Sequence, residues 1–113
     1  MKKTLIALAS ALLLSGTLAF AETEHTTQSL EHANAAVTHG QAGHAPILVE
    51  HAEAALTHAE AAQKVEANPH MAEAITHLKA AIDTGKKGDA AGATEHAKVA
   101  VDHIKMTGVG AKQ

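Results

Sequence analysis

Apolar residues form one continuous run near the start of the chain and then a series of helical stripes. Residues 4–14 (TLIALASALLL) are almost all apolar, whereas beyond residue 22 small and apolar side chains recur every three or four positions. That spacing places an apolar stripe along one side of an α-helix. Glycine and proline residues interrupt the pattern and mark the expected helix ends. The pattern predicts four helices, at 26–39, 45–66, 69–84 and 90–107.

The breaks between these helices consist of residues that favour turns and caps. GQAG at 40–43 and GKKG at 85–88 are expected loops. Asn68-Pro69 is typical of an N-cap followed by proline at the first helical position, and Asp89 is a second expected N-cap.

The expected core is rich in alanine, which lets helices approach closely but buries little area per residue, so a domain of this size is marginally stable. Four stripes contribute to it: Leu30, Ala33 and Val37; Leu48, Ala52, Ala55, Leu56 and Ala59; Met71, Ile75, Leu78 and Ile82; Ala93, Ala97, Ala100, Val101 and Ile104.

The helical part of the chain is a repeat with a period of 45 residues. Residues 25–60 and 70–105 align without a gap and are identical at 12 of 36 positions, including histidines and glycines. Each copy predicts one helical hairpin, at 25–64 and 70–109. The expected fold is therefore all-α, an up-down four-helix bundle made of two duplicated hairpins.

Residues 1–21 are expected to be a signal peptide. MKK at 1–3 is basic, the apolar run follows, and AFA at 19–21 places small residues at −3 and −1 of a cleavage site. A membrane anchor is the alternative, but the apolar run is shorter than the roughly 20 residues that span a bilayer. We expect a periplasmic domain at 22–113 that has no membrane association after cleavage.

Composition argues against several functions. The chain has no cysteine, so it has no disulfide, thiolate ligand or covalent c-type haem. Of its nine Lys and Arg residues two are Lys2 and Lys3, which leaves seven lysines against twelve acidic residues beyond residue 21. With no arginine or aromatic side chain there, nucleic-acid binding is not expected. Di-iron bundles need paired Glu-x-x-His motifs, and since only Glu22-x-x-His25 fits, we expect no enzyme.

Histidine is the most distinctive residue of the chain. In HAPILVEHAEAALTH (44–58) it recurs every seven positions, a step that drifts about 20° around a helix and rises about 10.5 Å. The histidines thus form columns that flank the apolar stripes. Histidines this far apart on one helix cannot share an ion, so a second ligand must come from a neighbouring helix. The candidate metal ligands are His25, His32, His39, His44, His51, His58, His70, His77, His96 and His103.

The numbering suggests how these histidines pair. Antiparallel folding about GQAG and GKKG would bring pairs within a hairpin to the same height, about one heptad apart. Pairing across the seams between hairpins is the alternative, because bundle handedness decides which columns face each other. Within hairpins the pairs are His25 with His58, His32 with His51, His39 with His44, His70 with His103, and His77 with His96, while Thr84 and Asp89 replace the sixth pair.

Imidazole with oxygen ligands suits Cu(II), Ni(II) and Zn(II), and affinity is highest for copper. Glu73 precedes His77 by one turn and is a candidate to join it, while Met106 is either a soft ligand or an apolar helix end. Several partly hydrated sites favour buffering or scavenging of divalent ions, and protonation of the histidines below about pH 6 would weaken the binding.

We expect a monomer, with metal-linked association as the alternative. A rival function is a periplasmic stress or interaction module whose histidines sense acidity.

The segments EHANAAVTHGQAGHAPILVEHAEAALTHAEAA, HMAEAITHLKAAI and ATEHAKVAVDHI resemble the histidine-rich small metal-binding protein family of the bacterial periplasm. The resemblance extends over essentially all of 22–113. It implies a repeat-built four-helix protein that binds several divalent ions, prefers copper and takes part in metal tolerance or copper handling. It also implies that the ten heptad histidines are the ligands. The chain departs from the pattern at Thr84 and Asp89.

Overall fold

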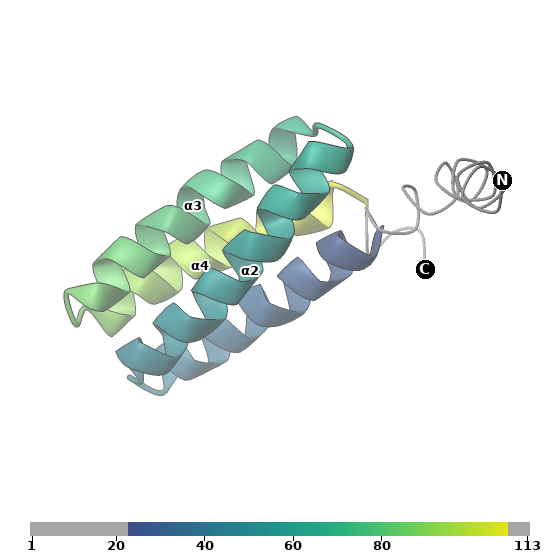
Figure 1. Ribbon diagram of the computed structural model, residues 1–113. Helices are drawn as coiled ribbons and strands as arrows, with labels where there is room; N and C mark the ends of the chain where they lie inside the picture. Colours follow the sequence, from purple (N-terminus) through teal and green to yellow (C-terminus); the bar gives the residue numbers. More distant parts are fainter. Residues whose placement is uncertain (1–22, 109–113) are drawn as a thin grey trace, which may run out of the picture.

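Four antiparallel helices pack into a bundle in the computed structural model, which describes residues 23–108 (Figure 1). The first helix covers residues 23–41 and is followed by α2 (Ala45–Val65), α3 (Pro69–Lys86) and α4 (Ala90–Met106). Consecutive helices pack side by side, whereas α2 and α4 make little contact across the bundle. The expected all-α four-helix fold is confirmed. The expected signal peptide lies outside the described residues.

The N-terminal caps of α3 and α4 are those that the sequence predicts. The Asn68 side chain accepts hydrogen bonds from the backbone N–H groups of His70 and Met71, at 2.8 and 3.3 Å. Asp89 accepts one from the N–H of Gly92 at 2.9 Å. These bonds satisfy N–H groups that lack a partner within the helix. No helix in the described range is long and apolar enough to cross a bilayer.

Gly40 and Gly85 lie inside helices, although the sequence predicts them as the first loop residues. The first helix continues to residue 41 and α3 to residue 86. A Cβ on Gly40 would collide with Thr94 Oγ1, and one on Gly85 would lie 2.6 Å from Val49 Cγ2. Since Thr94 and Val49 occupy equivalent repeat positions, the same close approach occurs twice where the hairpins meet.

Alanines occupy most of the buried positions of the bundle, together with a few larger side chains. The predicted core residues Leu48, Met71, Leu78 and Ile104 are fully buried, as expected. Ala36, Ala74 and Ala81, which the expected stripes omitted, are also completely buried. At these alanines the helices approach closely, and some of the larger predicted residues lie at the flank of the contact. The predicted core residues that lie half-buried there are Leu30, Val37, Leu56, Ile75 and Ile82.

Candidate metal centre

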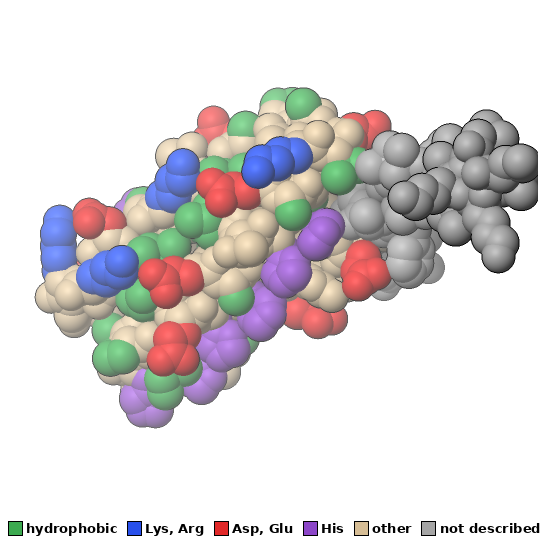
Figure 2. Space-filling model, viewed as in Figure 1, with side chains coloured by type: hydrophobic (Ala, Val, Ile, Leu, Met, Phe, Trp, Pro, Cys, Tyr) green, Lys and Arg blue, Asp and Glu red, His purple; other side chains and the backbone are tan. Residues whose placement is uncertain are grey.

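All ten histidines lie along the two seams within hairpins, one seam on each side of the bundle. Six line the seam between the first helix and α2, where they form a continuous column on the surface (Figure 2). Four line the seam between α3 and α4. His44 is exposed, and the other nine are half-buried. We call these columns the first ladder (His25, His32, His39, His44, His51 and His58) and the second ladder (His70, His77, His96 and His103).

The first ladder contains the pairs expected for an antiparallel hairpin. The Nδ1 atoms of His25 and His58 are 3.0 Å apart, and those of His32 and His51 are 3.3 Å apart. The third pair, at the loop end, is wider, with 6.2 Å between the ring centroids of His39 and His44. The sequence left open whether histidines pair within a hairpin or between hairpins. In the structure they pair within the hairpin.

The second ladder repeats this arrangement with two pairs. The Nδ1 atoms of His70 and His103 are 3.2 Å apart, and those of His77 and His96 are 3.4 Å apart. At the position of the third pair Asp89 caps α4. The second hairpin therefore repeats the two Nδ1 contacts of the first and lacks the pair of histidines at the loop end.

Paired rings are staggered along the bundle, which corrects our expectation that they lie at the same height. His58 is 5.2 Å from His25 but also only 5.9 Å from His32, measured between ring centroids. Together these distances barely exceed the rise of about 10.5 Å per heptad, so the three rings are almost in line. Helical side chains lean toward the N-terminus of their own helix. In antiparallel helices the rings therefore lean in opposite directions and interleave.

The interleaving produces stacking between successive pairs. The rings of His32 and His58 are tilted by only 5° from each other, as are those of His39 and His51 at 5.3 Å. The second ladder has the same contact between His77 and His103, at 6.1 Å and 9°. Each ladder is thus a continuous column of imidazoles that alternate between two helices.

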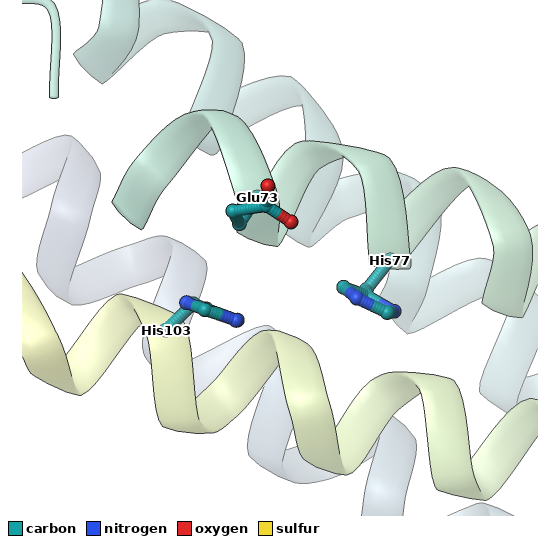
Figure 3. Close-up of side chains that lie close together, drawn as sticks. All are labelled: Glu73, His77 and His103. Carbon is teal, nitrogen blue, oxygen red and sulfur yellow. The ribbon is translucent and has the colours of Figure 1, made fainter. Parts of the chain in front are cut away.

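One carboxylate completes a group of three candidate ligands among the described residues. Glu73, His77 and His103 each present a ligand atom within 4.8 Å of the others (Figure 3). The proximity of Glu73 to His77 agrees with the one-turn spacing, since both belong to α3. The sequence did not predict that His103, and not His77's own partner His96, would be the second imidazole. The stagger of the rings explains why His103 lies close to Glu73, because it places the His103 ring beside that of His77.

Comparison with known families is decisive for the class of the protein. The chain matches the small metal-binding protein family over residues 1–107. The chain belongs to this family. A search of curated proteins found no match. The predicted resemblance is confirmed, and the family is one of metal-binding proteins and not of enzymes.

In this member of the small metal-binding protein family the pair geometry suits a shared ion. With metal–nitrogen bonds of about 2.0–2.1 Å, Nδ1 atoms 3.0–3.4 Å apart correspond to a nitrogen–metal–nitrogen angle of about 90–115°. That range includes tetrahedral and square-planar coordination. The separations of the paired nitrogens are therefore compatible with coordination of one ion by each pair.

Protons compete with metal for the same nitrogens. Burial lowers the pKa of His58 below its ordinary value of 6.5, and repulsion from protonated His25 and His32 lowers it further, against a smaller effect of Glu24. A lower pKa leaves more of this ring neutral near pH 6. Metal coordination needs an unprotonated nitrogen, so this shift at His58 reduces the competition from protons at this ring.

Proposed function

We propose that this chain binds and buffers several divalent transition-metal ions in the periplasm, with Cu(II) preferred and Ni(II) and Zn(II) also bound. Membership of the small metal-binding protein family supports the general function. The observation that carries the proposal further is the set of four imidazole pairs whose Nδ1 atoms lie 3.0–3.4 Å apart. The proposed ligands are all ten histidines of the two ladders.

The donor set favours exchangeable binding. A pair supplies two imidazole nitrogens, and the remaining positions around the ion are left to water or a carboxylate. Such sites hold an ion less tightly than closed sites with four protein ligands, which suits buffering. Imidazole nitrogens favour copper among the divalent ions, in line with the general order of affinities. The alternation of rings in each ladder would also let an ion pass between neighbouring pairs.

Titration of the mature protein, residues 22–113, tests the proposal. We expect calorimetry with a competing chelator to detect several sites, with Cu(II) bound more tightly than Ni(II) or Zn(II). Free imidazole at the same concentration as the histidines is the reference. The proposal is wrong if no ion binds to the protein more tightly than to that reference.

The periplasmic location is a separate part of the proposal. It depends on the basic, apolar and small-residue segments of residues 1–21. Expression of the full chain in a bacterium, followed by cell fractionation and mass measurement, should show a periplasmic product that begins at Glu22. An uncleaved product in the cytoplasm would contradict this location while leaving metal binding untouched.

A further inference from the structure

We propose that Glu73, His77 and His103 form a distinct three-ligand site for a four-coordinate ion such as Zn(II), with water as the fourth ligand. The proposal rests on the proposed function, since it concerns the metal sites of the second ladder. It differs in that this site includes a carboxylate and takes its two imidazoles from different pairs. Figure 3 shows the three side chains gathered at the seam between α3 and α4.

The three ligands are placed by the helices themselves. Glu73 and His77 are four residues apart on α3 and therefore lie on the same side of it. His103 comes from α4, and its ring lies nearly parallel to that of His77. The ligand atoms are within 4.8 Å of one another, whereas ligands around a tetrahedral zinc lie about 3.3 Å apart. Glu73 is exposed, so its side chain has room to change rotamer, and we expect such a change to bring the carboxylate closer to the two rings.

The donor set selects the class of ion. Two imidazoles and one carboxylate, with one position open to water, are a combination that zinc takes in proteins. The carboxylate brings a negative charge that a pair of neutral imidazoles lacks. An ion held by three protein ligands is expected to dissociate more slowly than one held by two. The second hairpin, although it has fewer histidines, would then contain the tightest zinc site.

The internal repeat provides a natural comparison for this site. A shift of 45 residues places His32 and His58 of the first ladder at the positions of His77 and His103, and their rings stack in the same way. The position of Glu73, however, is taken by Gln28. The Gln28 amide donates a hydrogen bond to Glu24 at 3.2 Å. At these three repeat-related positions the two frameworks therefore differ by one carboxylate.

Binding at this site competes with the simple pairs of the second ladder. His77 and His103 also contact His96 and His70 through their Nδ1 atoms. A neutral imidazole coordinates an ion through one nitrogen and keeps a proton on the other. The three-ligand site therefore engages one ring from each pair, and we expect it to fill in preference to the two pairs.

Exchanging the two repeat-related residues tests the inference. The variants are Glu73→Gln, Gln28→Glu and both together, with Glu60→Gln on α2 as a control for the loss of one exposed negative charge. Zinc affinity is measured by calorimetry with a competing chelator, and Co(II) absorption reports four-coordinate binding. We expect one tight site in the parent protein and in Glu60→Gln. In Glu73→Gln that site should be at least about tenfold weaker, because a bond and a charge are lost.

The reciprocal variants give the sharper result. Gln28→Glu should add a second tight site with a four-coordinate Co(II) spectrum, and the double variant should move the single tight site to the first hairpin. Equal zinc affinity in the parent, Glu73→Gln and Glu60→Gln would overturn the inference and leave the proposed function standing. An equal weakening in Glu73→Gln and Glu60→Gln would also overturn it, since overall charge would explain the loss. Absence of any ion binding by the parent would instead refute the proposed function itself.

Discussion

Each imidazole inside the ladders has ring neighbours on both sides, because its ring leans toward the preceding turn of its own helix, whereas the rings at the ladder ends have one. His58 illustrates the consequence, with His25 on one side and His32 on the other. Positive charge on His25 or His32 disfavours protonation of His58. At the residue scale, acid is therefore expected to act on this part of the ladder.

Acidification should destabilise the metal-free protein through His58. Its pKa is lowered in the folded state by burial and by His25 and His32, so the unfolded chain binds more protons at this residue. The contribution of His58 to stability is complete above about pH 6.5 and is lost as pH falls through the lowered folded-state pKa. Urea unfolding between pH 5 and 8, with chelator present, should give a flatter pH dependence for His58→Gln than for the parent. A steeper dependence in the variant would contradict this assignment.

At the scale of the helices, much of the structure follows from the sequence. The caps Asn68 and Asp89 start α3 and α4 where expected, because their side chains satisfy local N–H groups. The ends at Gly40 and Gly85 were predicted too early. A glycine indicates a helix end only when no tertiary contact requires a small residue at that position. Here the close approach of the other hairpin requires glycine at both positions. Local sequence cannot show that requirement.

The candidate site was predictable to a similar extent. Heptad spacing and mirror numbering identify the partners His25 with His58 and His32 with His51, because they depend only on helix geometry and loop position. The stacking of successive pairs was not predicted, since it depends on the direction in which each ring leans. The same omission hid the meeting of Glu73 with His103.

Close helix contact at Gly40 should be essential to the joining of the hairpins. Gly40→Ala places a methyl group against Thr94, and we expect a loss of about 1–3 kcal/mol of unfolding free energy from overpacking. This loss would exceed the gain of up to about 1 kcal/mol in helix propensity. Adding Thr94→Ala should restore part of the loss, as measured by urea unfolding against Thr94→Ala alone. A neutral Gly40→Ala protein would show that the helices do not pack this closely.

Metal stoichiometry should reveal which rings share an ion in the first ladder. His32→Gln and the double variant His32→Gln/His51→Gln should each lose one site, because both residues belong to one pair. The matched variant His32→Gln/His58→Gln removes one member from each of two pairs and should lose two sites. Equilibrium dialysis at saturating Zn(II) measures the number of ions bound. If His32→Gln/His58→Gln instead lost one site and His32→Gln/His51→Gln lost two, the ions would lie between stacked rings and not between paired Nδ1 atoms.

On the scale of the whole molecule, the seams of the bundle divide into two kinds. The two seams within hairpins carry the histidine ladders, whereas the seams between hairpins include the close contacts of Gly40 and Gly85. Ions bound in the ladders would link the two helices of each hairpin and leave the contacts between hairpins unchanged. The core between the hairpins is mostly alanine and adds modest stability. Metal binding should therefore account for a large share of the stability of the loaded protein.

Metal loading should raise the thermal midpoint of the protein (residues 22–113) substantially. A ligand that binds only the folded state adds about 2.7 kcal/mol at a free concentration of 100 times Kd. In a small domain each kcal/mol raises the midpoint by about 4–8 °C, so one filled site should add upwards of about 10 °C. Calorimetry with Zn(II) or Cu(II) should show this rise and its reversal by chelator, whereas Mg(II), which prefers oxygen ligands, should have no effect. The rise should be smaller in His32→Gln/His51→Gln, which lacks one pair. An unchanged midpoint at saturating Zn(II) would mean that the unfolded chain binds the ions equally well, and that the folded ladders do not bring the ligands together.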